Sequence, residues 1–220
     1  MFPKYTTYVE PFVGSGAILF SKEPSPVEII NDLDGDVFEN FQLLKDANTD
    51  VNAYQLLNDI QNIQRFVNGT HISKENRLLQ KLYLSMNTFS GKNTGKIYQA
   101  KSGKQKIKYL GFYKNRMQDV EIKNSDYKEI ITHYDSAETL FFLDPPYEQT
   151  NLYNHSTFDY IELQAILKNI KGKFILTLND SLNIRTIFKD YQMTEIKIKG
   201  NYTPKSVGSK DRTELIITNY

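Results

Sequence analysis

Both ends of the chain show apolar and polar residues in the pattern of strands alternating with helices. Residues 6–12 begin as a β-type run that ends in a Gly-containing turn, and residues 27–30 form a second, β-branched run. Residues 17–20 and 35–45 have helical spacing, and the second segment places its apolar residues on one face. This order of strand, turn, helix and strand predicts the start of a doubly wound α/β sheet.

A nearly continuous apolar run at residues 139–143 predicts a strand that is buried on both faces. A short helix is expected just before it, at residues 126–134. After it, the pattern predicts a helix, a strand, a helix and two final strands, at residues 160–170, 173–178, 181–188, 195–199 and 214–218.

The middle of the chain has a different pattern. Two helices are predicted there, at residues 51–67 and 73–86. Residues 89–111 are rich in Gly, Lys, Asn and Ser without a strong period, which indicates a loop or a hairpin. We therefore expect one α/β catalytic domain built from residues 1–50 and 126–220, interrupted by a helical, basic insertion at residues 51–125.

Composition limits the classes of protein that the chain can belong to. Its 220 residues, of which 40% are hydrophobic, suffice for one domain or for a domain with one insertion. The absence of Cys excludes disulfides and thiolate metal sites, and only 3 His argue against a zinc site. No run reaches the roughly 20 apolar residues of a membrane span, and no signal-peptide pattern is found, so we expect a cytoplasmic protein without membrane contacts.

The net charge of +1 hides an uneven distribution. Residues 23–50 contain eight acidic residues and one basic residue, Lys45, whereas residues 91–118 contain eight basic residues and no acidic one. Such a basic run is either a solvated Lys-rich loop or a contact surface for a polyanion.

The strongest candidate for a functional site is the motif Asp144-Pro145-Pro146-Tyr147, which directly follows the apolar run. The two prolines remove N–H donors and fix two φ angles, so the strand ends and its carbonyls point in set directions. A carboxylate and a rigid carbonyl can accept both N–H groups of an amine on a base, and the ring can stack on that base. Held in this way, the nitrogen directs its lone pair at a methyl donor. An ordinary Pro turn is the alternative.

A second candidate is the Gly-rich turn after the first predicted strand, Glu10-Pro11-Phe12-Val13-Gly14-Ser15-Gly16. Glycines let the backbone approach a ligand closely, although the third Gly of a dinucleotide fingerprint is missing. Asp32 ends the next strand, where an acid accepts hydrogen bonds from ribose hydroxyls in such folds. Asp32 could instead cap the following helix, and Asp34 competes for both roles.

Taken in order, these motifs resemble the Dam-type (D12 class) adenine-N6-specific DNA methyltransferases. In that class the Gly-rich motif comes first, a target-recognition insertion next and the Asp-Pro-Pro-Tyr motif last. The matching stretches span nearly the whole chain, at residues 8–16, 29–32, 87–91, 124–127, 142–147 and 214–220.

The resemblance implies a Rossmann-like, S-adenosylmethionine-dependent methyltransferase sheet with a helical, basic target-recognition insertion. It implies a cofactor site of Glu10, Pro11, Phe12, Gly14, Ser15, Gly16, Asp32, Asp126 and Tyr127, with Asp32 on the ribose. Asp144 and the carbonyl of Pro145 would hold the amine of a flipped adenine, beside Pro146, and Tyr147 would stack on the base. Contacts to DNA phosphates are expected from Lys92, Lys96, Lys104, Lys106, Lys205, Lys210 and Arg212. No metal is implied.

The sequence also departs from the family. The family normally has a Trp-x-Gly-Gly-Lys motif before the first strand, which helps to bind the methionine end of the cofactor, and this sequence contains no Trp. Lys92-Asn93-Thr94-Gly95 does not reproduce the family's Arg-containing hairpin, so a GATC-like recognition sequence is not carried over. A catalytically weak or inactive DNA-binding protein on a truncated methyltransferase fold is the alternative function.

The expected partner is double-stranded DNA in a bacterial or phage setting, with a cognate restriction endonuclease as a genetic partner. Cytosine-N4 or an RNA amine also fits the four-residue motif, because that motif suits any planar amine. A cytosine-C5 enzyme needs a Cys nucleophile, which this chain lacks.

Overall fold

The structure is a computed structural model that describes residues 2–46, 110–148, 158–198 and 212–220. The helices predicted at residues 51–67 and 73–86 lie outside these ranges, as does nearly all of the predicted loop at 89–111.

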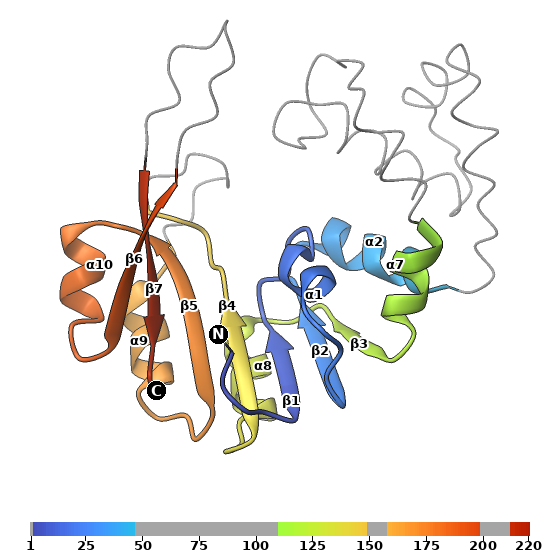
Figure 1. Ribbon diagram of the computed structural model, residues 1–220, viewed down its shortest axis with the longest axis horizontal. Coiled ribbons are helices and arrows are strands. Elements are labelled where there is room, and N and C mark those ends of the chain that lie inside the picture. Colours follow the sequence, from blue (N-terminus) through green and yellow to red (C-terminus); the bar gives the residue numbers. More distant parts are fainter. Residues whose placement is uncertain (1, 47–109, 149–157, 199–211) are drawn as a thin grey trace, which may run out of the picture. The chain divides into compact units, whose positions relative to one another are not determined.

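Seven strands form one mixed sheet in the order β3-β2-β1-β4-β5-β7-β6 (Figure 1). In its centre, β1 pairs in parallel with β2 and β4, and β4 pairs in parallel with β5. At one end, β7 runs antiparallel to both β5 and β6. The strands are β1 (Thr7–Glu10), β2 (Val27–Asn31), β3 (Val120–Lys123), β4 (Thr139–Leu143), β5 (Lys173–Asn179), β6 (Gln192–Ile198) and β7 (Arg212–Thr218). This mixed α/β sheet confirms the predicted fold class.

The chain divides into two compact units, residues 1–33 with 123–220, and residues 34–122. The first unit holds β1, β2 and β4 to β7 with four helices, α1 (Ala17–Ser21), α8 (Tyr127–Tyr134), α9 (Tyr160–Leu167) and α10 (Leu182–Ile187). In the second unit, α2 (Gly35–Lys45) contacts α7 (Leu110–Met117), and Lys45 Nζ donates a 2.7 Å hydrogen bond to the Val120 carbonyl. The domain boundaries that we expect at residues 50 and 126 stay a prediction.

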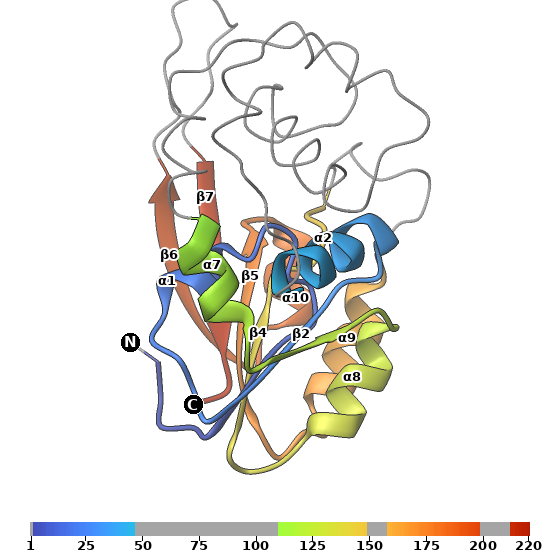
Figure 2. The same cartoon turned by 90° about the vertical axis from the view of Figure 1, so that its right-hand side faces the viewer.

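The core of the first unit forms around β4, whose five residues are all buried. Phe141 and Leu143 pack in one apolar cluster with residues of β1, β2, β5 and β7. Buried residues of α8, α9 and α10 complete this cluster, namely Ile130, Ile131, Tyr160, Leu163, Leu167 and Ile184, together with Phe188 directly after α10. Figure 2 shows α8 and α9 next to each other on one face of the sheet. The burial of β4 on both faces confirms the interpretation of its apolar run.

Side-chain caps mark where α2 and α8 begin. The carboxylate of Asp34 accepts the Asp36 N–H at 2.8 Å and caps α2, and Asp126 caps α8 through the Lys128 N–H at 2.9 Å. Such a cap satisfies a backbone donor that has no partner within the helix. The capping role that the sequence left open between Asp32 and Asp34 therefore belongs to Asp34.

Some elements differ from their predicted bounds. The helix predicted at residues 160–170 ends at Leu167, and beyond it Asp135 of another segment accepts the N–H groups of Lys171 and Gly172. Helix α7 begins at Leu110, inside the segment predicted as loop or hairpin, and β3 was not predicted. Both elements are short, and β3 buries only Val120, so neither produces a clear hydrophobic period.

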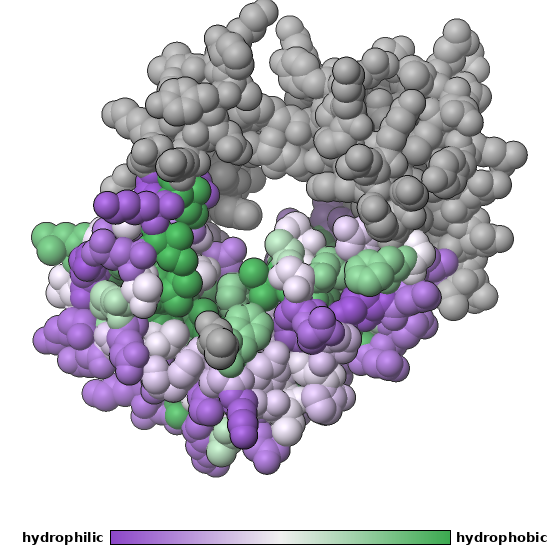
Figure 3. Space-filling model, viewed as in Figure 1, coloured by the Kyte–Doolittle hydropathy of each residue, from purple (hydrophilic) through white to green (hydrophobic). Residues whose placement is uncertain are grey.

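Hydrophilic residues dominate the face of the molecule drawn in Figure 3, with a strip of hydrophobic surface over β6 and β7. On β6, Ile196 is 41% exposed. None of the helices within the described ranges has the length and hydropathy of a membrane-spanning segment.

Candidate active site

The predicted site segments follow the carboxyl ends of three neighbouring parallel strands. Glu10 is the last residue of β1, Asp32 comes directly after β2, and Asp144 comes directly after β4. The same edge receives Asp126 at the start of α8, because Ser125 is bonded to Asn31. In open α/β sheets, ligands bind outside the carboxyl ends of the strands.

The Gly-rich turn is tied to the end of β2. Gly14 and Gly16 have positive φ angles of 49° and 71°, a region that costs other residues free energy. The N–H of Gly14 donates to Asp32 Oδ2 at 2.9 Å, and the N–H of Val13 donates to the Asn31 carbonyl at 2.9 Å. The turn therefore keeps its backbone close to the Asp32 carboxylate.

A buried amide joins three segments of the site. Asn31 is 1% exposed, and its Nδ2 donates to the carbonyls of Pro11 at 2.9 Å and Ser125 at 3.0 Å. Its Oδ1 accepts the Ser125 N–H at 2.9 Å. Sequence analysis gave Asn31 no role of its own, although a polar residue that ends a buried β-branched strand is a recognisable signal.

Three aromatic rings meet beside this junction. The ring centroids of Phe12 and Tyr127 are 5.2 Å apart, and Phe158 lies 5.7 Å from Phe12 and 5.4 Å from Tyr127. All three are partly buried and pack against the core cluster. Sequence analysis assigned Phe12 and Tyr127 to one ligand site, and the structure brings them into contact and adds Phe158.

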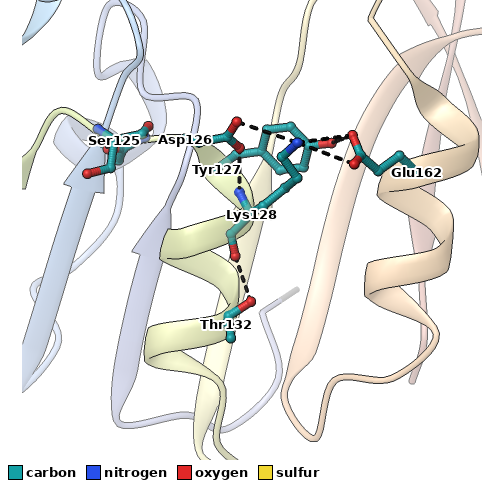
Figure 4. A network of polar contacts seen from close by, with 7 residues as sticks. Ser125, Asp126, Tyr127, Lys128, Thr132 and Glu162 are labelled. Carbon is teal, nitrogen blue, oxygen red and sulfur yellow. Dashed lines mark hydrogen bonds and ion pairs between the residues drawn. The ribbon is translucent and has the colours of Figure 1, made fainter.

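Polar contacts join the start of α8 to α9 (Figure 4). Lys128 Nζ lies 3.2 Å from Glu162 Oε1 and 3.6 Å from Asp126 Oδ2, and the Tyr127 hydroxyl donates to Glu162 Oε2 at 3.4 Å. Burial, followed by the negative charge of Glu162, raises the pKa of Tyr127, so its hydroxyl stays protonated. The ion pairs are solvent-exposed, so water screens them and they contribute little to stability.

The Asp144 carboxylate is exposed and oriented by a neighbouring strand. Thr177 of β5 donates a 2.7 Å hydrogen bond from Oγ1 to Asp144 Oδ1. Tyr147 is half-buried, and burial, followed by the charge of Asp144, raises its pKa. A neutral Tyr147 ring therefore lies near a carboxylate that can accept hydrogen bonds.

Glu10 is a buried carboxyl group, 2% exposed, at the end of β1. The Tyr8 hydroxyl donates to its Oε2 at 2.9 Å. Burial and the negative charge of Asp144 raise the pKa of Glu10 to about 8, against the opposing effects of the Tyr8 hydrogen bond and of Lys22. The Glu10 carboxyl is therefore mostly protonated at neutral pH.

The peptide groups around Tyr147 are held by residues that sequence analysis did not single out. The Tyr160 hydroxyl donates to the Pro146 carbonyl at 2.5 Å, and the Glu148 N–H donates to Asn179 Oδ1 at 2.9 Å. Thr177 and Asn179 alternate at the end of an otherwise apolar strand, which is the sequence signal that could have found them.

Of the residues expected to contact DNA, the structure describes Arg212, the exposed first residue of β7, whose Nε lies 3.0 Å from Glu214 Oε1. The other six lie outside the described residues, namely Lys92, Lys96, Lys104, Lys106, Lys205 and Lys210. Within the described ranges, no group of three or more His, Asp or Glu residues is arranged to hold a metal ion.

Comparison with known proteins relates this arrangement to a family. The model of the D12 class N6 adenine-specific DNA methyltransferases matches residues 1–202. The type II methyltransferase M1.LlaDCHI of Lactococcus lactis subsp. cremoris is 24% identical, over 99% of this chain and 87% of its own length. The type II methyltransferase M.MjaIII of Methanocaldococcus jannaschii is 26% identical, over 97% and 88%.

Among solved structures, the putative methyltransferase yhhF from Escherichia coli superposes with a TM-score of 0.38 at 10% identity. The superposition covers 96% of this chain and 74% of that protein.

Proposed function

Since the chain belongs to the D12 class N6 adenine-specific DNA methyltransferase family, we propose that it transfers a methyl group from S-adenosylmethionine to N6 of adenine in double-stranded DNA. The observation that carries the proposal is the placement of two motifs on paired central strands. The Gly-rich turn follows β1 and Asp144-Pro145-Pro146-Tyr147 follows β4, and these strands pair in parallel with Val9 opposite Phe141. A site for the methyl donor after β1 and a site for the target amine after β4 would therefore lie next to each other.

The residues at the end of β1 and β2 fit the cofactor. Gly14 and Gly16 allow close approach of the backbone, and the Asp32 carboxylate beside Gly14 is suited to accept hydrogen bonds from ribose hydroxyls. Rings of Phe12 and Tyr127 offer apolar faces to an adenine. Glu10, Pro11, Ser15 and Asp126 complete the proposed site. When bound there, S-adenosylmethionine supplies a methyl group activated by its sulfonium.

Asp144 and the Pro145 carbonyl accept the two N–H groups of the target amine in this proposal. The adenine amine is a poor nucleophile because its lone pair is delocalised into the ring, and two acceptors in fixed positions favour a pyramidal nitrogen. Thr177 holds the Asp144 carboxylate in one orientation before the base arrives. Such preorganised electrostatics are typically worth several kcal/mol of the activation free energy. The nitrogen would gain the methyl group as the methyl–sulfur bond of the sulfonium breaks and the cofactor leaves as a thioether, and one amine proton would pass to solvent, without a covalent enzyme intermediate.

Tyr147 stacks on the adenine after the base leaves the duplex. Flipping is required because the amine is paired inside double-stranded DNA and its lone pair is inaccessible there. The raised pKa of Tyr147 keeps the ring neutral, which suits contact with a base held by a carboxylate. Basic residues at positions 92–116 and 205–212 would contact the phosphates.

The relatives are type II methyltransferases. We propose a restriction–modification setting for this chain as well, in which a cognate restriction endonuclease is the genetic partner.

Incubation with labelled S-adenosylmethionine and unmethylated plasmid DNA, followed by nucleoside analysis, tests this function. N6-methyladenine is the expected product, and Asp144→Ala is expected to abolish it while DNA binding persists. Asp190→Ala, an exposed carboxylate between α10 and β6, is the matched control and should retain activity. A product of N4-methylcytosine would overturn the base assignment, and no binding of the cofactor even with DNA present would favour the inactive DNA-binding alternative.

A further inference from the structure

Both peptide groups that flank Tyr147 are hydrogen-bonded to side chains of other elements. The Pro146–Tyr147 peptide offers its carbonyl to the Tyr160 hydroxyl of α9 at 2.5 Å. The Tyr147–Glu148 peptide offers its N–H to Asn179 Oδ1 at the end of β5, at 2.9 Å. Because a peptide group is planar, these two contacts together limit both backbone torsions of Tyr147.

The first of these partners is itself rigid. Tyr160 is 8% exposed, and its ring packs edge-on against Phe158 with centroids 5.1 Å apart. Asp159 caps the same turn of α9 by accepting the Glu162 N–H at 2.9 Å. Burial, followed by the charge of Glu148, raises the pKa of Tyr160 to about 12, so the hydroxyl keeps the proton that it donates to Pro146.

The second partner is rigid for a different reason. Asn179 is paired with Glu214 in the antiparallel ladder of β5 and β7. Beyond it, Ser181 Oγ and Asn183 Nδ2 donate to the two carboxylate oxygens of Glu148, at 2.5 and 2.8 Å. The residue after Tyr147 is therefore held through both its backbone and its side chain.

We propose that Tyr160 and Asn179 are positioning residues that lock the backbone of Tyr147 and so fix its ring where the flipped base stacks. This inference rests on the proposed function. The ring of Pro146 already fixes the φ angle of that residue, so the two hydrogen bonds complete the restraint of the segment from Pro146 to Glu148. Neither residue needs to touch the DNA or the cofactor.

A positioning role and a purely structural role predict different effects of mutation on the rate and on the stability. A misplacement of about 1 Å at a reacting centre can lower a rate by roughly 100-fold without any loss of folding. A purely structural role would lower the thermal midpoint and the fraction of active protein, and the turnover per active site would stay the same.

Tyr160→Phe is the sharpest test, because it removes one hydroxyl and keeps the buried ring. We expect kcat per active site on unmethylated plasmid DNA to fall roughly 10- to 100-fold. The Kd for S-adenosylmethionine, the KM for DNA and the thermal midpoint should stay close to wild type. Tyr191→Phe is the matched control, since Tyr191 packs on Phe174 away from this segment, and it should keep the wild-type kcat.

A second pair of variants keeps the inference testable if Tyr160→Phe fails to fold. Asn179→Ala should lower kcat in the same way, and Asn179→Asp, which retains an acceptor for the Glu148 N–H, should restore much of it. A wild-type kcat in Tyr160→Phe would overturn the inference and leave the proposed function intact. So would a loss of total activity that is fully explained by a smaller fraction of active protein. Absence of methylation by the wild-type protein would instead remove the proposed function and the inference with it.

Discussion

Gly14 donates its backbone N–H to Asp32 Oδ2 at 2.9 Å, so the turn after β1 and the acid after β2 are joined directly. The same carboxylate is the group proposed to bind the cofactor ribose. Asp32 therefore has two functions in the proposal, one for the turn and one for the ligand, whereas Asp34 two residues later caps α2.

Asp32→Ala should weaken the binding of S-adenosylmethionine by roughly 10- to 100-fold, because hydrogen bonds to a charged group contribute about 1.5–3 kcal/mol. Isothermal titration calorimetry measures this loss. Asp34→Ala is the control: it removes the helix cap and should lower the free energy of unfolding by about 1 kcal/mol, with cofactor affinity retained. Equal cofactor affinity in the two variants would contradict the assignment of the ribose to Asp32.

Thr177→Val removes the hydroxyl that bonds Asp144 Oδ1 and keeps the shape of the side chain. We expect kcat to fall about tenfold or more, because the carboxylate loses a charge-assisted hydrogen bond that fixes its orientation. Single-turnover methylation of plasmid DNA measures the chemical step. Thr194→Val on the exposed edge strand β6 should leave that rate unchanged, and an unchanged rate in Thr177→Val would show that Asp144 needs no such support.

The order of strands and helices at the two ends of the chain was readable from the sequence because these elements carry strong patterns. β4 is a run of five buried residues, and α2 has the predicted bounds because Asp34 caps it. The two motifs at Gly14 and Asp144 were also predictable from the sequence. Gly allows backbone conformations that other residues avoid and Pro fixes the φ angle, and both effects depend on the local sequence alone.

The residues that hold the site in place by hydrogen bonds could not be predicted from the sequence, because each contact depends on which elements become neighbours in the fold. Thr177 reaches Asp144 only because β5 pairs with β4, and Asn31 bonds Ser125, which lies 94 residues further along the sequence. Tyr160 looks like an ordinary residue at the start of a helix until α9 packs beside Pro146. Local pattern carries no information on such pairings, so these residues required the fold.

Gly172→Ala should lower the free energy of unfolding by about 1–3 kcal/mol, a typical cost of overpacking. A Cβ at Gly172 would lie 2.9 Å from the Thr139 carbonyl oxygen and 3.0 Å from that of Ser136, and backbone atoms cannot move aside cheaply. Urea unfolding followed by circular dichroism measures the change. Gly111→Ala in α7 has open space around the new Cβ and should be neutral or stabilising, by up to about 1 kcal/mol. Equal stability of the two variants would contradict the packing at β4.

Glu10 predicts how stability depends on pH. Its pKa is raised from 4.5 to about 8 in the folded protein, through burial and the charge of Asp144. Between these two values the folded state binds more protons than the unfolded state at this position, so its contribution to stability is present below about pH 4.5 and is lost as the pH rises towards 8.

Glu10→Gln should therefore flatten the pH dependence of the free energy of unfolding between pH 5 and pH 8. The amide oxygen of Gln can still accept the Tyr8 hydroxyl, so the variant removes the titration and keeps the hydrogen bond. The difference in slope between wild type and variant is at most about 1.4 kcal/mol per pH unit, the limit for one proton. Urea titrations at pH 5.5, 6.5 and 7.5 give both slopes, and Glu129→Gln, an exposed carboxylate on α8, should keep the wild-type slope. If Glu10→Gln kept it as well, the Glu10 carboxyl would be ionised in the folded protein across this pH range, which would contradict its raised pKa.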